Sequence, residues 1–500
     1  MPPFDLFVVP FLTLPILVWL LDATAGDPVS GIVARFRRGI ATGFWFGFGF
    51  FAAGLWWIGF ALLVEADRFA VFLPLAVVAL PTGLAVFWGI ACGIAITIWR
   101  DGWQRIFWLA AWLAAAEYAR GFLFTGFPWN QLGMAAMPFS FAMQSASLIG
   151  SNGVTLAAIP VFAILAAGPF DRLGARVFAG LCAAALAAHL GFGIFRMAQL
   201  PLSPKPGVML RLVQPAISQD EKWTAEFADR SFRKLLDLSA GAPSESGLAG
   251  IDLLAWPESA FAFVLTERAD ALAAIAELLP DETLLATGAL RLDRTAGKEP
   301  PPAYNSIYLI DADGGIAAAS DKAHLVPFGE YLPFAELLAG FGIEQIVHAQ
   351  GGFQAGRLPA PVKAGRAGNL LPLVCYEAIF PGLIRQSPRP DFILNLTNDA
   401  WFGKTPGPYQ HWRQAILRGV EFGLPVVRVA NSGVSSVSDP LGRIIAKLPL
   451  GAAGHVDSPL PEAGLPTFYA IYGERPFLAM LILFAAIGLA APWHPRRPKL

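Results

Sequence analysis

Cysteine and charge are scarce in this chain. Only three of its 500 residues are cysteines, and only 15% are charged. Cys92 and Cys182 fall in long apolar runs, which leaves Cys375 as the only cysteine in the more polar part of the sequence. A single thiol there excludes a disulfide framework. The 55% of apolar residues and a mean hydropathy of +0.53 exclude an ordinary soluble globular protein of this length.

Other common functional signatures are also lacking. The sequence contains no cluster of metal ligands, no phosphate-binding glycine loop and no basic patch suited to nucleic acid. Glycines such as those in 47–49 lie in apolar sequence, where small residues serve helix packing. We therefore expect no metal, no cofactor and no nucleic-acid partner, and no pattern indicates an oligomeric state.

Long apolar windows lie at both ends of the chain. A helix that rises 1.5 Å per residue needs about 20 residues to cross a hydrocarbon layer of roughly 30 Å. Seven windows approach this length: 4–21, 39–63, 71–99, 106–124, 150–168, 175–195 and 476–492. We predict a transmembrane bundle of six spans in 1–195, an α/β domain in 196–475, and a last span with a basic tail in 476–500.

Basic residues predict the orientation of these spans, because short loops rich in Lys and Arg stay on the cytoplasmic side. The segments after the first, third, fifth and last windows carry Arg35, Arg37, Arg38, Arg100, Arg105, Arg172, Arg176, Arg496, Arg497 and Lys499. Loops 64–70 and 125–149 have no basic excess, and the α/β domain shares their side. We predict a multi-pass membrane protein whose α/β domain is extracytoplasmic, in the periplasm. The start MPPFD, which has no Lys or Arg, would also face outward, so either the first span enters from outside or an upstream helix is missing from this sequence.

Two charged residues lie at the end of one predicted span. Glu117 and Arg120 are spaced i,i+3, so their side chains share a helix face. Charges within a membrane are costly and point to function. The alternative is that the pair only anchors the span at the outer surface.

The α/β domain alternates apolar strand-like runs with helical segments. Helices are predicted over 219–239, 267–279 and 408–423. Strands are predicted over 208–217, 251–260, 283–292, 304–313, 315–325, 369–378, 391–400, 425–433 and 434–444. Glu258, Lys322 and Cys375 fall near the ends of three of these strands. Open α/β sheets present reactive side chains at the carboxyl edge, so we expect the three to meet there.

These three residue types suit nucleophilic chemistry. A thiol with a pKa of about 8.5 is mostly protonated at neutral pH, so it needs a base or a nearby cation. Glu258 supplies the first and Lys322 the second. The ammonium would also stabilise an oxyanion together with backbone N–H groups just after Cys375. Taken singly, each residue is as well explained by an ordinary turn, a solvated edge or a packed thiol.

Order and context add specificity. The runs WPES, DKxHLVPFGEY and CYE, in this order, resemble the Glu-Lys-Cys signature of the nitrilase (carbon–nitrogen hydrolase) superfamily. With the flanking spans, the whole chain resembles the apolipoprotein N-acyltransferase family. The resemblance implies a membrane α-helical bundle plus an α/β domain, a nitrilase-like α-β-β-α sandwich on the extracytoplasmic side. It also implies that Glu258 is the general base, Lys322 the oxyanion stabiliser, Cys375 the nucleophile and Glu330 a supporting carboxylate.

The resemblance assigns further residues to substrate binding. Tyr376 and Glu377 match positions beside the acyl site, and Asn398 lies in a motif near the nucleophile. Trp223 and Trp401 resemble aromatic residues on flexible arms over the site. The alternative for both tryptophans is ordinary packing.

The implied reaction is ping-pong. Cys375 takes a fatty acyl chain from a phospholipid as a thioester, and the N-terminal amine of the S-diacylglyceryl cysteine of an apolipoprotein then accepts it. One alternative is a membrane-tethered amidase or nitrilase that hydrolyses a small C–N substrate. Another is a non-enzymatic sensor or transporter with an exported ligand-binding domain.

Overall fold

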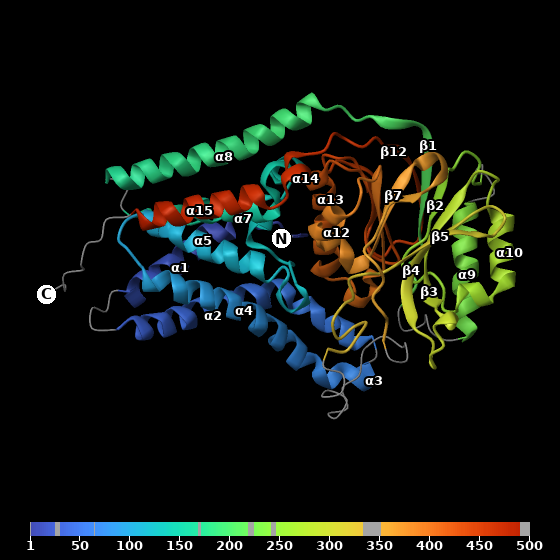
Figure 1. Ribbon diagram of the computed structural model, residues 1–500, viewed down its shortest axis with the longest axis horizontal. Coiled ribbons are helices and arrows are strands. Elements are labelled where there is room, and N and C mark those ends of the chain that lie inside the picture. Colours follow the sequence, from blue (N-terminus) through green and yellow to red (C-terminus); the bar gives the residue numbers. More distant parts are fainter. Residues whose placement is uncertain are drawn as a thin grey trace.

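The computed structural model describes residues 2–25, 31–64, 66–168, 172–218, 225–241, 247–333 and 352–490. A bundle of helices occupies one end of the molecule and a domain with two β-sheets occupies the other (Figure 1). Helices from the sheet domain lie between the two parts, so the bundle packs against a helical layer and not against a bare sheet.

Each predicted apolar window contains a helix. The main helices of the bundle are α1 (Val9–Ala25), α2 (Ile32–Leu55), α4 (Leu73–Thr97), α5 (Gln104–Ala119), α7 (Ala146–Phe162), α8 (Leu173–Gln199) and α15 (Arg475–Leu489). Shorter pieces are η1 (Trp56–Leu63), α3 (Ala66–Phe69), η2 (Ala70–Phe72), η3 (Leu123–Thr125), η4 (Leu132–Ala136), α6 (Ser140–Met143) and η5 (Ile164–Ala167). Among the residues that the structure describes, three stretches are long and apolar enough to cross a membrane: Ile32–Leu63, Ala70–Thr97 and Leu173–Gln199. α1, α7 and α15 are shorter apolar helices.

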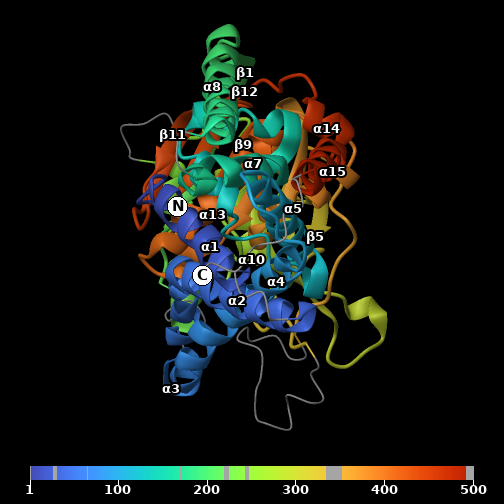
Figure 2. The ribbon, with the colours of Figure 1, turned by 90° about the vertical axis from the view of Figure 1, so that its left-hand side faces the viewer.

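Small residues let α2 and α4 approach closely. A Cβ atom added to Gly43 would lie 2.5 Å from the carbonyl oxygen of Trp88, and one added to Gly39 would lie 2.8 Å from that of Cys92. Gly39 and Gly43 therefore serve backbone packing between the two helices. Of the glycines in 47–49, Gly47 lies against α4, whereas a Cβ on Gly49 would meet nothing within 4 Å. In contrast, α8 lies along one edge of the bundle in both views, and the chain passes from its end into β1 (Figures 1 and 2).

Two six-stranded sheets form the α/β domain. The first sheet has the order β12-β1-β2-β3-β4-β5, with β1 (Pro204–Gln214), β2 (Leu253–Ala255), β3 (Leu284–Leu292), β4 (Ala303–Ile310), β5 (Ile316–Asp321) and β12 (Gly454–Pro461). The second has the order β11-β10-β9-β8-β7-β6, with β6 (Val362–Lys363), β7 (Asn369–Val374), β8 (Phe392–Thr397), β9 (Val426–Ala430), β10 (Ser435–Ser438) and β11 (Ile444–Leu448). β7, β8 and β9 pair in parallel, so their carboxyl ends share one edge.

The sheets pack face to face between two helical layers, an α-β-β-α sandwich (Figure 1). Side chains of both sheets, such as Leu212 and Leu396, share one buried core. The outer face of the first sheet is covered by α9 (Ala225–Ala240) and α10 (Ala269–Leu278). The outer face of the second is covered by α12 (Pro381–Gln386) and α13 (Pro406–Phe422), and this core continues into the bundle. A nitrilase-like sandwich joined to apolar helices was the predicted fold class.

Most predicted strands are present, with three differences. The predicted strand 251–260 is paired only over Leu253–Ala255, and that over 369–378 ends at Val374, just before the cysteine. The run 434–444 contains the short β10 and only the first residue of β11. β12 was not predicted, because its sequence GHVDSPLP has two prolines and little apolar character; it forms through antiparallel pairing with β1.

Candidate active site

Cys375 sits at a sharp turn between β7 and the short helix η9 (Cys375–Ile379). Its φ is 50°, in the left-handed region that residues with a Cβ rarely adopt. Such strain persists only where the surroundings impose it, and it often marks a functional position. The thiol is free and half-buried. Burial and the Glu258 carboxylate raise the pKa of Cys375, whereas the Lys322 ammonium opposes this effect.

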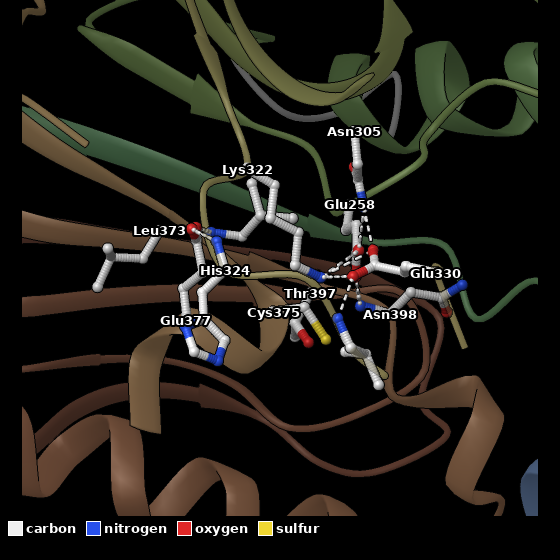
Figure 3. Close-up of polar contacts among 12 residues, drawn as sticks. Glu258, Asn305, Lys322, His324, Glu330, Leu373, Cys375, Glu377, Thr397 and Asn398 are labelled. Atoms are coloured by element: carbon white, nitrogen blue, oxygen red, sulfur yellow. Dashed lines mark hydrogen bonds and ion pairs between the residues drawn. The ribbon is translucent and has the colours of Figure 1, made fainter. Parts of the chain in front are cut away.

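Three charged residues form what we call the sulfur-side cluster: Glu258, Lys322 and Glu330. The Lys322 ammonium lies 2.9 Å and 2.8 Å from the two carboxylate oxygens of Glu330, and 3.9 Å from Oε1 of Glu258. All three residues are at least nine-tenths buried. Figure 3 shows the Cys375 sulfur pointing into the space that this ammonium and these carboxylates face. Burial alone would lower the pKa of Lys322, but Glu330 and Glu258 outweigh it and raise that pKa.

The chain fixes Glu258 through close backbone contacts. Ser259 has a φ of 49°. A Cβ on Gly288 of β3 would lie 2.5 Å from the Glu258 Cα, so β3 needs a residue without a side chain at this position. The carboxylate accepts hydrogen bonds from the Asn305 side chain and from the backbone N–H of Asn398, each 2.7 Å long (Figure 3). Asn305 also donates to Glu330, so one amide orients both carboxylates.

Glu377 ties the lysine segment to the cysteine turn. One carboxylate oxygen accepts from the backbone N–H groups of Ala323 and His324, at 2.7 Å and 3.0 Å. The other accepts from the N–H of Val374 at 2.8 Å. Burial raises the pKa of Glu377 to about 7, although these bonds and Lys322 lower it. Both segments that carry the reactive groups therefore share this carboxyl group.

Tyr376 faces the helical bundle. Its hydroxyl donates to the carbonyl of Gly126, and its ring packs against Phe127 and Trp129 of the same loop. Arg120 holds this loop by donating to the carbonyls of Phe127 and Trp129, the latter at 2.8 Å. This loop of the bundle thereby packs against Tyr376, the residue that follows the cysteine.

The guanidinium of Arg120 is itself paired inside the bundle. It binds both carboxylate oxygens of Glu117, at 3.0 Å and 2.6 Å, and the Trp88 indole donates to Glu117 at 2.7 Å. Both charged side chains are almost fully buried. The pair is therefore not a surface anchor, and it supports the loop at Tyr376.

A second set of charged residues lies on the other side of Cys375. We call Asp399, His411 and Arg428 the carbonyl-side cluster. Asp399 lies 2.9 Å from Nδ1 of His411 and accepts from Arg428 at 2.7 Å. Arg428 and His411 hold the pKa of Asp399 well below its usual range, although burial opposes them.

This cluster contacts Cys375 directly through His411 and indirectly through Thr397. His411 Nε2 lies 3.1 Å from the Cys375 carbonyl oxygen. The Thr397 hydroxyl interacts with the thiol and also donates to Asp399 at 3.1 Å.

The remaining predicted residues have different placements. Asn398 is buried, and its amide oxygen accepts from Asn431 and from the N–H of Ala400. Trp401 is half-buried in η10 (Asp399–Phe402). Trp223 lies outside the described residues. The structure thus brings Glu258, Lys322, Glu330, Cys375, Tyr376, Glu377 and Asn398 together at the carboxyl edges of the two sheets.

Asn305 and the residues of the carbonyl-side cluster were not predicted from the sequence. His411 lies within helix α13 and Arg428 within strand β9, where a polar residue is commonplace. The only available signal was the polar content of NLTND (395–399), which follows an apolar run.

The chain is similar to known proteins over nearly its whole length. Residues 1–165 match the model of the apolipoprotein N-acyltransferase N-terminal domain, and residues 210–459 match the carbon–nitrogen hydrolase model. Apolipoprotein N-acyltransferases of Brucella melitensis and Rhizobium leguminosarum are 45% and 46% identical to the chain. The alignments cover 98% of this chain in both cases, and 92% and 93% of the relatives.

Similar solved structures include an amidase of the nitrilase superfamily from Nesterenkonia AN1. It is 19% identical, with a TM-score of 0.39, over 56% of this chain and 98% of the amidase. The family models and the two close relatives decide the assignment. The chain belongs to the apolipoprotein N-acyltransferase family, within the carbon–nitrogen hydrolases.

Proposed function

We propose that this enzyme moves a fatty acyl chain from a phospholipid to the N-terminal amine of the S-diacylglyceryl cysteine of apolipoproteins, through a thioester on Cys375. The observation that carries the proposal is the sulfur-side cluster, a buried base and ammonium that face a strained thiol. Family membership supports the acyl acceptor, since the relatives are named for N-acylation of apolipoproteins.

In the first half-reaction Glu258 accepts the thiol proton as Sγ attacks the ester carbonyl carbon. The electron pair of the C=O bond moves to oxygen, where the Lys322 ammonium and the N–H of Tyr376 stabilise it. When the intermediate collapses, the ester C–O bond breaks, and the departing lysophospholipid oxygen takes the proton from Glu258. Glu330 keeps Lys322 in place and charged.

In the second half-reaction Glu258 takes a proton from the incoming amine, whose nitrogen attacks the thioester carbon. The C–S bond then breaks, and the proton returns to the sulfur. Tyr376, Asn398, Trp401 and Trp223 are the side chains assigned to substrate contact. The three bonds to Glu377 favour a positioning role for this carboxylate between Lys322 and Cys375.

Apolar side chains beside the site suit substrates that stay in a bilayer. Phe124 and Phe328 are 89% and 53% exposed, and Phe122 and Leu123 are exposed next to the Gly126 carbonyl that Tyr376 contacts. Exposed aromatic residues beside the site are typical of the boundary between membrane and water. They would guide acyl chains to Cys375 and limit the access of water to the thioester.

The arrangement of the helices supports a periplasmic site in a multi-pass protein of the bacterial inner membrane. Residues 1–195 form the membrane bundle, 196–475 the catalytic domain, and 476–500 the last span and tail. The starts of α5 and α8, which carry Arg105 and Arg176, lie at the end of the bundle away from the sheets (Figure 1). Arg100 contacts the Leu489 carbonyl at the same end. These basic ends would face the cytoplasm.

A transfer assay tests the proposal. Purified protein is incubated with a phospholipid labelled in its acyl chain and with a synthetic S-diacylglyceryl lipopeptide, and the products are separated by mass. We expect label on the α-amine of the lipopeptide and an equal amount of lysophospholipid. An N-acetylated lipopeptide should remain unlabelled. Release of free fatty acid or hydrolysis of small amides, without transfer, would contradict the proposal.

A further inference from the structure

Two side chains hold the carbonyl group of Cys375. His411 Nε2 lies 3.1 Å from this oxygen and Asn395 Nδ2 lies 3.2 Å from it. Both side chains are fully buried, and neither belongs to the sulfur-side cluster. A carbonyl oxygen has two lone pairs, so these two donors saturate it and fix its direction.

Neither donor is free to turn. Nδ1 of His411 lies 2.9 Å from Asp399 and 3.1 Å from Arg428, and the ring packs against Trp129 at a centroid distance of 5.2 Å. Asn395 also donates to the Leu373 carbonyl at 3.0 Å, and its oxygen accepts from Arg428. The direction of the Cys375 carbonyl is therefore set by a rigid, fully buried network.

Fixing this carbonyl also fixes the amide that follows it. In a planar trans peptide the C=O and N–H bonds point in opposite directions, so the N–H of Tyr376 points away from His411 and Asn395. Tyr376 is the second residue of η9, and the first N–H groups of a helix lack an acceptor within it. Cys375 has an unfavourable φ, so this peptide would relax without its two donors.

We propose that His411, together with Asn395, is a positioning residue that aims the Tyr376 N–H at the oxyanion formed on the acyl group at Cys375. The inference rests on the proposed thioester chemistry. It assigns to the carbonyl-side cluster a role in the acyl-transfer step, and none in generating the thiolate.

A pair of substitutions at one position tests this role. In His411→Gln the side-chain amide reaches the Cys375 carbonyl, whereas in His411→Asn it is shorter and reaches only towards Asp399. Two reactions of the full-length protein are compared. Acylation of Cys375 by p-nitrophenyl butyrate passes through an oxyanion, and alkylation by iodoacetamide does not.

We expect His411→Asn to slow acylation by about 100-fold, because one oxyanion donor is misdirected. Its alkylation rate and its saturation constant for the ester should stay near those of the wild type. His411→Gln should restore most of the acylation rate. Asn395→Asp, which is isosteric but has no donor, should repeat the selective loss and serves as an independent variant if those at His411 do not fold.

Equal losses in the two reactions would overturn the inference, because they would indicate a general collapse around the thiol. So would normal acylation in both His411→Asn and Asn395→Asp. A wild-type protein that reacts with the aryl ester but not with phospholipid would refute only the proposed donor, and the variants would still decide the role of His411.

Discussion

The two charged clusters around Cys375 differ in how they contact it. The sulfur-side cluster faces the thiol and consists of groups that move protons or stabilise charge. The carbonyl-side cluster contacts the backbone of the same residue through His411 and consists of groups that pair with one another. A nucleophile at a strained turn therefore depends both on the groups that activate its side chain and on those that hold its peptide.

The clusters also come from different parts of the fold. Glu258 and Lys322 follow β2 and β5 of the first sheet, whereas Asp399 follows β8 and Arg428 lies in β9 of the second. The second cluster contacts the bundle through the packing of Trp129 on His411. Activation of the thiol is thus a property of the sandwich, and alignment of the peptide also depends on the membrane helices.

Loss of the base should have the largest effect. In Glu258→Gln the thiol loses its proton acceptor, while burial still raises the pKa of Cys375. We expect acyl transfer to fall by roughly 10³- to 10⁴-fold. Alkylation of Cys375 by iodoacetamide at neutral pH should fall as well, because no base takes the thiol proton. Alkylation at the wild-type rate would show that another group accepts the thiol proton.

Loss of the cation should have the next largest effect. Lys322→Met removes an oxyanion donor and leaves Glu330 and Glu258 buried without their partner. We expect thioester formation to fall by about 10²- to 10³-fold. Thermal unfolding is measured in parallel with the double variant Lys322→Met/Glu330→Gln, which removes one uncompensated charge. The double variant should be the more stable of the two and equally inactive; recovery of activity in it would contradict the role of Lys322.

Disturbing the loop of the bundle that contacts Tyr376 should have a smaller effect, which is confined to the alignment of the peptide after Cys375. Arg120→Lys keeps the charge beside Glu117 but cannot also hold the carbonyls of Phe127 and Trp129. We expect acyl transfer to fall by about tenfold, because small misplacements of reacting groups are costly. Iodoacetamide alkylation should change little. If alkylation falls as much as acyl transfer, the bundle also affects the reactivity of the thiol, and this result would contradict the distinction between the two clusters.

A buried carboxyl group far from the thiol should affect only stability. Burial raises the pKa of Glu421 to about 7, although Arg418 and the Ser151 N–H, which donates at 2.8 Å, lower it. The folded state thus binds this proton more tightly than the unfolded state, so its stabilising effect is complete below about pH 4.5 and is lost as the pH rises through about 7. We expect the melting temperature to fall by a few degrees over this range and Glu421→Gln to flatten the fall. An unchanged pH profile in the variant would contradict this assignment.

The sequence predicted that Glu258 and Lys322 meet Cys375, because each of the three follows a strand-like run, whereas Glu330 was assigned through the family resemblance alone. The sequence was insufficient for His411 and Arg428, because only the register of α13 against β8 and β9 brings them to Asp399. Similarly, β12 could not be predicted from GHVDSPLP, since its conformation depends on pairing with β1, more than 200 residues away in the chain. Local patterns reveal reactive side chains, whereas supporting contacts made across the fold require the structure.

The most direct test is the mass of the Cys375 peptide after brief exposure of the protein to phospholipid, with no acceptor present. We predict one fatty acyl adduct on Cys375 that is lost on addition of a diacylated lipopeptide and is absent in Glu258→Gln. Transfer of the acyl chain to the lipopeptide without any adduct on Cys375, or with the adduct on another residue, would contradict the account.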